Sequence, residues 1–347
     1  LKPCWLMSPL SISQVLPVKI GLFDTIIFDE ASQVRVEDAV PSIYRANKMI
    51  VVGDPKQMPP TNFFSANEFV DFDSDEEESE GEELTQSILD LAANIYPSEI
   101  LEWHYRSRSE SLIAFSNRAF YGGRLIAVPN PFVITEGDVI KFHSAEDAYF
   151  DHKNGNRVEA DTLVNRLSEI LKANLNKSIG IIAMGQSQMQ AINDAIENRA
   201  SIDVNFRNNF ERMENYFDGE TDASLFVKNL ENVQGDERDI ILISVGYAPS
   251  SSEKKLYMNF GPLSKQGGGR RLNVAITRAK HNIEVFCSFN PDLISTDEAD
   301  FGKNPDLVLF GRYLKYVKAI SDRNIERAKN ILDSFGVGAS ITTRKSS

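Results

Sequence analysis

Two adjacent carboxylates at the end of an apolar segment are the first residues of this chain that could carry out chemistry. Asp29 and Glu30 directly follow residues 23–28 (FDTIIF), a mostly β-branched and aromatic run that predicts a buried strand. In a doubly wound sheet, ligands lie at the carboxyl ends of the strands. Mg²⁺ takes few carboxylates and keeps waters and phosphate oxygens as its other ligands. The pair therefore suits a site in which Asp29 and Glu30 hold Mg²⁺ and Glu30 deprotonates a water, although acidic residues also occur where helices begin.

A second polar segment follows the next apolar run. Residues 49–52 predict another strand, and residues 53–60 (GDPKQMPP) come after it. Gln57 carries a donor and an acceptor on a short side chain, which suits contact with a γ-phosphate or with the water that attacks it. A proline-rich turn without a ligand is the alternative for this segment.

The elements that must position these residues alternate along the chain. We expect strands at 23–28, 49–52, 100–104, 138–142, 179–183, 225–227, 240–245 and 283–287. We expect helices at 36–45, 88–93, 108–121, 157–171, 188–196, 272–279, 306–320 and 323–335. This alternation predicts an α/β fold built on doubly wound parallel sheets. Because Gly122 and Gly123 end a helix, we expect one domain at 1–122, a second at 123–320, and a helix with a tail at 321–347.

Charge is distributed unevenly. The net charge is −13, and residues 71–83 hold nine acidic residues with no Lys or Arg, so the remainder of the chain carries −4. This acidic insertion is either a solvated linker or a mimic of nucleic acid that competes for a basic groove. The two cysteines are far apart and predict neither a disulfide framework nor a metal set, which favours a reducing, cytoplasmic setting. No apolar run reaches the roughly 18 residues of a membrane span.

Several segments together resemble one family. Residues 29–33 (DEASQ) and 53–60 resemble motifs II and III of superfamily 1 helicases, and residues 233–239 (VQGDERD) and 272–279 (LNVAITRA) resemble motifs V and VI. Residues 105–107 (YRS) and the pair Asn156 and Glu159 match further family segments, in the family's order. The resemblance runs from about Met7 to Phe289. It is nearest to the branch of the nonsense-mediated-decay RNA helicase, and within it to large bacterial proteins that join a helicase to a Vsr-type endonuclease.

The resemblance implies two RecA-like domains with ATP and Mg²⁺ in the cleft between them. Arg106 and Arg278 match the family's arginines that contact the γ-phosphate, a role that suits a planar, permanently charged guanidinium. Glu237 matches the acid that approaches the nucleotide sugar, and Gln234 and Gly235 match the bend that couples nucleotide to strand binding. The catalytic set implied in this way consists of Glu30, Gln57, Arg106 and Arg278.

The residues that would contact nucleic acid are less well marked. Ser8 and Ser11 lie in a segment resembling one that touches backbone phosphates, although an ordinary loop fits equally well. Gln188 keeps its position in a segment resembling motif IV, where residues 183–185 (AMG) replace the family's Thr-Pro-aromatic. Arg270 and Arg271, after a run of three glycines, are candidate strand contacts.

No G-x-x-x-x-G-K-[ST] phosphate loop occurs in the 347 residues. We therefore expect an ATP-dependent helicase or translocase on single-stranded nucleic acid, with DNA favoured, whose first domain is incomplete at its N-terminus and whose phosphate loop lies upstream. A nuclease domain after Ser347 remains open, and the 347 residues alone are expected to be inactive. The rival reading is a non-catalytic module that keeps the fold and binds nucleic acid or a partner.

Overall fold

The computed structural model describes residues 4–60, 86–128, 136–145, 147–151, 154–173, 176–249, 256–265, 267–296 and 305–336. These residues form two units: residues up to Leu101 belong to unit 1, and described residues from Glu102 onwards belong to unit 2. Among the described residues, no helix is both long and apolar enough to cross a membrane.

Unit 1 contains a pair of parallel strands with helices packed on one face. Its elements, in chain order, are α1 Pro9–Val15, β1 Phe23–Phe28, the 3₁₀ turn Ala31–Gln33, α2 Val36–Ile43, β2 Ala46–Val51 and α3 Ile88–Ile95. The register pairs Phe28 with Val51. Phe28, Ala39 and Ile88 lie in its buried core. The side chains of Ile27 and Ile50, on the other face of the strand pair, are 64% and 49% exposed.

Unit 2 is built on a five-stranded parallel sheet. Its strand order is β5, β11, β10, β6 and β9. The bounds are β5 Ile140–Ser144, β6 Ile179–Ala183, β9 Phe226–Asn229, β10 Arg238–Ser244 and β11 Ala279–Cys287. Sequence predicted a strand at each of these places, and the parallel pairing confirms the α/β class. The sheet is strongly apolar because parallel strands are covered on both faces.

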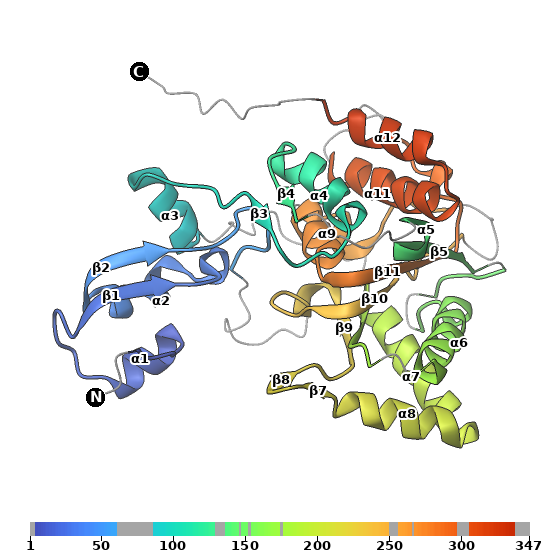
Figure 1. The fold of residues 1–347 in the computed structure, drawn as a ribbon, viewed down its shortest axis with the longest axis horizontal. Helices are drawn as coiled ribbons and strands as arrows, with labels where there is room; N and C mark the ends of the chain where they lie inside the picture. The colour runs from blue at the N-terminus through green and yellow to red at the C-terminus, as the bar shows by residue number, and fades with distance from the viewer. Residues whose placement is uncertain are drawn as a thin grey trace. The chain divides into compact units, whose positions relative to one another are not determined.

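Helices cover both faces of this sheet (Figure 1). On one face lie α6 Arg157–Lys172, α7 Gln186–Ile202 and α8 Val204–Glu214. On the other lie α4 Glu110–Tyr121, α9 Gly268–Ile276, α11 Pro305–Ser321 and α12 Ile325–Asp333. The short elements are β3 Trp103–His104, β4 Ile126–Ala127, α5 Glu136–Val139, β7 Phe217–Asp218, β8 Thr221–Asp222 and the 3₁₀ turns Leu230–Asn232, Gly261–Leu263 and Pro291–Leu293.

Helix α4 packs within unit 2, so the division of the chain precedes the boundary at 122/123 that we expected. Phe115 of α4 contacts the rings of Tyr313, Tyr316 and Phe335, and the Tyr316 hydroxyl donates to the Ser111 carbonyl at 2.9 Å. The glycines after α4 end the helix, but the apolar face of α4 is covered by α11 and α12. Aromatic pairs of this kind contribute beyond the area they bury. The C-terminal helices therefore hold the segment that carries Arg106 in unit 2.

Candidate functional site

The polar residues of unit 1 gather at one edge of its strand pair. Asp29 and Glu30 follow β1, and the segment from Gly53 to Gln57 follows β2, which runs parallel to β1. The pairing extends past the strands, because the Val52 N–H donates to the Phe28 carbonyl at 2.8 Å and the Ala31 N–H donates to the Val52 carbonyl at 3.0 Å. Both polar segments predicted from the sequence thus leave the sheet side by side.

Glycine is required at position 53 by this close approach. A Cβ on Gly53 would lie 3.0 Å from the Ala31 nitrogen and 3.1 Å from the Ser32 nitrogen. Both of those atoms are backbone atoms of the turn that follows Glu30, so they cannot move aside as a flexible side chain would. Gly53 therefore allows the two segments to lie in contact.

The backbone at Glu30 adopts an uncommon conformation. Its φ of 51° and ψ of 39° lie in the left-handed region, which few residues other than glycine adopt. The Glu30 N–H donates to the Asp29 carboxylate at 2.9 Å. This turn leads the chain directly into residues 31–33 and leaves both Asp29 and Glu30 exposed at the strand ends. Strain of this type is often found at functional sites.

In the described part of the chain, the amide nitrogen of the Gln57 side chain makes a hydrogen bond, but its amide oxygen does not. Its Nε2 donates to Asp54 Oδ2 at 3.1 Å, and the Lys56 N–H donates to Asp54 Oδ1 at 2.8 Å. Among the described residues, the buried Oε1 of Gln57 has no hydrogen-bond partner. An unpaired buried acceptor costs about 1–3 kcal/mol, so it is normally matched by a ligand or water. Asp54, which orients Gln57, was not among the predicted site residues; its position three residues before Gln57 in the GDPKQ turn was the available signal.

The residues present fit the Mg²⁺ that the family implies. Within the described ranges, no group of three or more His, Cys, Asp or Glu side chains forms a metal cluster. Asp29 and Glu30 offer two exposed carboxylates at the end of β1, and the segment with the unpaired acceptor of Gln57 follows the neighbouring strand β2. Mg²⁺ requires few protein ligands when waters and phosphate oxygens complete its shell.

In unit 2, the carboxylate of Glu237 pairs with one predicted site residue, Arg106, and with one residue that was not predicted, Lys280. Glu237 Oε2 lies 2.6 Å from Arg106 Nε, and Glu237 Oε1 lies 2.9 Å from Lys280 Nζ. Arg106 Nη1 also donates to the Thr277 carbonyl at 3.3 Å. Burial alone would raise the pKa of Glu237, but hydrogen bonds from Lys280 and Arg106 outweigh burial and hold that pKa below its ordinary value. Lys280 was not predicted, although it lies directly after the segment resembling motif VI.

Glu237 and Lys280 lie close together because β10 and β11 begin side by side in the sheet. Arg238 pairs with Ala279 in the sheet, so Glu237 and Arg278, each one residue earlier, lie at the same amino-terminal edge. Gln234 and Gly235 precede β10, with Gly235 at a φ of 88° that only glycine adopts readily. The chain therefore bends at Gly235, and its coupling of nucleotide to strand binding stays a prediction.

Arg278 is more deeply buried than its predicted role requires. It is 1% exposed, and its guanidinium donates to the Val274 carbonyl at 2.7 Å, the Asp236 carbonyl at 3.3 Å and the Thr277 hydroxyl at 2.9 Å. In this conformation the guanidinium binds the protein's own backbone. A phosphate contact by Arg278 requires that some of these hydrogen bonds be exchanged.

The predicted nucleic-acid contacts are divided between surface and interior. Ser8 caps α1, where its hydroxyl accepts from the Ser11 N–H at 3.2 Å, so this segment begins a helix and is not a loop. Arg270 and Arg271 lie in the first turn of α9, which starts at Gly268, four residues earlier than expected. Arg271 pairs with Glu231 at 2.5 Å, and both arginines are partly exposed.

Gln188 is buried in a polar network centred on Glu159. Gln188 is 1% exposed; its Oε1 accepts from the Asn156 N–H at 2.7 Å, and its Nε2 donates to Ser244 Oγ at 2.9 Å. Glu159 is fully buried and accepts from Ser244 Oγ at 2.7 Å and from Ser288 Oγ at 2.6 Å. The network joins α6 and α7 to the carboxyl ends of β10 and β11. The Gln188 side chain is thus buried and hydrogen-bonded inside unit 2, where it does not reach a nucleic-acid strand at the surface.

Replacing Glu159 with Gln is expected to remove a pH dependence of stability. Burial raises the pKa of Glu159 to about 7, against hydrogen bonds from Ser288 and Ser244 that lower it. The folded chain thus binds this proton more tightly than the unfolded chain, and the resulting stability is full below about pH 4.5 and is lost as pH rises through 7. The loss amounts to ~3 kcal/mol, since each pKa unit corresponds to about 1.4 kcal/mol.

The measurement is denaturant unfolding of wild type and variant from pH 5 to 8. The difference between their unfolding free energies isolates Glu159 from other titrating groups. Glu214, an exposed carboxylate on α8, provides the control, because Glu214→Gln should show no such trend. A pH-independent difference for Glu159→Gln would contradict the expectation.

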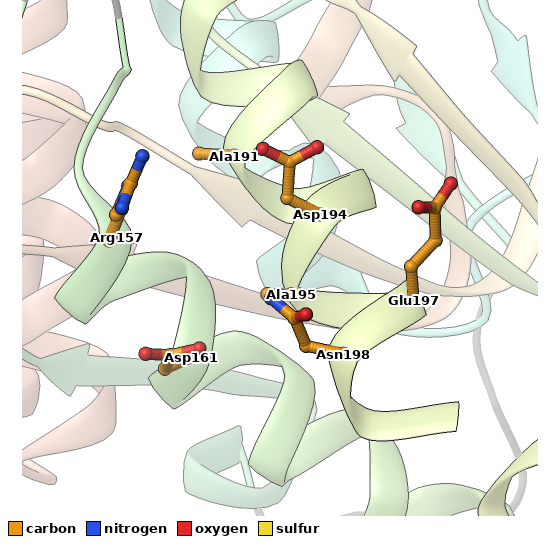
Figure 2. Close-up of a pocket in the computed structure, with 7 residues that line it drawn as sticks. All are labelled: Arg157, Asp161, Ala191, Asp194, Ala195, Glu197 and Asn198. Carbon is orange, nitrogen blue, oxygen red and sulfur yellow. The ribbon is translucent and has the colours of Figure 1, made fainter. Parts of the chain in front are cut away.

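A pocket of about 470 Å³ lies elsewhere in unit 2, between α6 and α7 (Figure 2). Arg157 and Asp161 line it from α6, and Asp194, Glu197 and Asn198 line it from α7. It contains none of the predicted site residues. Its lining has no aromatic side chain that could stack on a base.

Comparison with known proteins identifies relatives along most of the chain. Two family models, each described as an AAA domain, match residues 10–65 and 82–290. An uncharacterized ATP-dependent helicase of Mycoplasma genitalium, MG140, is 36% identical over 94% of this chain and 28% of its own length. Helicase SEN1 of Saccharomyces cerevisiae is 27% identical over 76% of this chain and 11% of its own length. The helicase/nuclease DNA2 of Xenopus laevis is 26% identical over 75% of this chain and 24% of its own length.

The chain therefore spans only about a quarter, or less, of the length of these relatives. The match to residues 82–290 nevertheless covers more than half of the chain. The relatives share the name of helicase and align with both units. The chain belongs to this AAA domain family, and the helicases among its relatives agree with the resemblance to superfamily 1 helicases.

Proposed function

We propose that the protein to which these residues belong is an ATP-dependent helicase or translocase that moves along single-stranded nucleic acid. The observation that carries the proposal is the edge of unit 1, where two exposed carboxylates and the segment that holds the unpaired acceptor of Gln57 leave neighbouring parallel strands. That combination suits a metal-bound phosphate and an attacking water. DNA is the favoured substrate, in keeping with relatives named as a DNA replication helicase/nuclease and a DNA polymerase alpha-associated DNA helicase.

The roles of the unit 1 residues follow from their chemistry. Asp29 and Glu30 hold Mg²⁺, which when bound supplies positive charge to phosphate oxygens. Glu30 takes a proton from the attacking water at its carboxylate, a step typically worth about 10²–10⁴ in rate. Gln57, oriented by Asp54, accepts a hydrogen bond from that water at Oε1. Arg106 and Arg278 of unit 2 neutralise the charge that develops on the phosphate oxygens.

We propose that the phosphate cradle comes from other residues of the longer protein, since these 347 residues contain no phosphate-loop motif. The exposed face of β1 and β2 supports this part of the proposal. Ile27 and Ile50 are 64% and 49% exposed there, although apolar side chains of parallel strands are ordinarily covered. We propose that upstream residues of the same longer protein supply both the cradle and this cover.

The chain alone is therefore expected to hydrolyse ATP at least about 10²-fold more slowly than the longer protein, the usual scale for losing preorganised phosphate donors. The measurement is steady-state ATP turnover of both proteins, with and without single-stranded DNA or RNA. Robust, strand-stimulated turnover by the 347 residues alone would contradict the proposed division of the site. Stimulation by RNA and not by DNA would reverse the substrate preference.

A non-catalytic module that keeps the fold is the second candidate, favoured by the missing phosphate loop. It predicts strand or partner binding with no turnover by the longer protein as well. The resemblance to helicases joined to a Vsr-type endonuclease adds a C-terminal nuclease to the main proposal. Nuclease activity of the longer protein on the displaced strand would test that addition.

A further inference from the structure

Lys280 lies in the charged cluster at the amino-terminal edge of the unit 2 sheet. Its Nζ is 2.9 Å from Glu237 Oε1, and the other oxygen of the same carboxylate is 2.6 Å from Arg106 Nε. One carboxylate thus holds two cations, one at each oxygen. The side chains of Lys280 and Arg106 are 35% and 31% exposed, so both reach solvent.

The backbone of Lys280 is also tied to the segment that carries Arg106. The Arg108 N–H donates to the Lys280 carbonyl at 2.8 Å. Arg106 in turn donates to the Thr277 carbonyl, three residues before Lys280. Main-chain and side-chain contacts therefore fix the positions of the two cations relative to each other, although they are far apart in sequence.

Charge in this cluster is unbalanced. Glu237 faces Arg106 and Lys280, while the neighbouring carboxylate of Asp236 pairs with Lys228 at 2.6 Å. Arg278 adds a further buried positive charge.

Two histidines, His104 and His281, lie near this cluster, and burial is the main cause of the pKa shift of each. Burial lowers the pKa of His104 to about 4, with a further contribution from Arg106. Burial, together with Lys177 and in spite of Asp239, lowers the pKa of His281. Both rings are thus favoured as neutral groups at neutral pH.

We propose that Lys280 is a third cation of unit 2 that contacts the terminal phosphate of a nucleoside triphosphate, with Glu237 holding Lys280 and Arg106 in position until the nucleotide binds. This inference rests on the proposed function. The single negative charge of Glu237 does not balance the two positive charges of Arg106 and Lys280, and a triphosphate would supply the missing negative charge. Ammonium groups bind phosphate as compact point charges. An exposed ion pair with a purely structural role would contribute little.

The test compares nucleotide binding by wild type and Lys280→Ala in the longer natural protein that carries its phosphate loop. Fluorescent derivatives of ATPγS and ADP are the probes. Lys280→Ala is expected to weaken ATPγS binding by on the order of tenfold to a hundredfold, as for one charge-assisted hydrogen bond. ADP affinity should be unchanged, since ADP lacks the terminal phosphate, and Lys280→Arg should keep most of the ATPγS affinity.

Lys318→Ala provides a matched control. Lys318 of α11 is 33% exposed, and it pairs at 3.1 Å with Asp322, which follows that helix, so it has nearly the exposure and pairing of Lys280. Its loss should change neither affinity. An equal loss of ATPγS and ADP binding in Lys280→Ala, or no loss of either, would overturn the assignment of Lys280. Failure of the wild-type protein to bind either nucleotide would overturn the proposed function as well, so the two failures can be told apart.

Discussion

Arg278→Ala is expected to lower ATP turnover by about 10³-fold or more while leaving strand affinity within a few-fold of wild type. The scale is that of arginines which stabilise the transition state of phosphoryl transfer. For this effect Arg278 has to leave its present position, because it is 1% exposed and donates to the carbonyls of Val274 and Asp236. Turnover and affinity for a single strand should be measured side by side in the longer protein.

Loss of those hydrogen bonds also destabilises the fold, by about 1–3 kcal/mol for unpaired buried groups. Arg278→Lys therefore accompanies the alanine variant. It keeps the positive charge but loses the planar fork, and it should recover stability more fully than turnover. Thermal unfolding of both variants separates the two effects.

Arg270→Ala is the comparison variant for strand binding. Arg270 is a partly exposed residue of the same helix region and is a predicted strand contact, so its loss should weaken strand binding and lower the salt dependence by about one phosphate contact. If Arg278→Ala shows that pattern and turns over ATP normally, Arg278 does not act on the nucleotide. The assignment of the unit 2 residues to ATP would then be wrong for that position.

Glu30→Gln is expected to lower turnover by about 10²–10⁴-fold and to leave nucleotide binding largely intact. Glutamine keeps the shape of the side chain but cannot accept a proton from water. The left-handed backbone at Glu30, with φ of 51°, is no more strained by Gln than by Glu, so the substitution tests chemistry and not folding. The measurements are steady-state turnover and equilibrium binding of ATPγS by the longer protein.

Glu37→Gln serves as its control. Glu37 is an exposed carboxylate in the first turn of α2, close in sequence to Glu30 but not at the strand ends. It should turn over ATP at the wild-type rate. If Glu30→Gln also stays within a factor of a few of wild type, Glu30 is not the general base.

Residue patterns were sufficient to predict the class of the fold and the local positions of its polar residues. Alternating apolar runs placed the strands, because a strand's period and its ends are properties of neighbouring residues. Asp29, Glu30 and Gln57 were placed after the strands in this way, since parallel strands end at a common edge. The left-handed turn at Glu30 and the use of Asp54 to orient Gln57 were not predicted.

Contacts between distant residues depended on how the elements pack. Glu237 joins Arg106 and Lys280 because β10 and β11 start side by side and α4 is held against α11 and α12. Gln188 turned inward because Asn156, Ser244 and Glu159 form a buried network that must satisfy its own polar groups. The same requirement buries Arg278 against a carbonyl of the preceding helix α9 and a carbonyl of the bend before β10. A motif names the residues that can do the chemistry, but which of them face a ligand is determined by packing between segments more than a hundred residues apart.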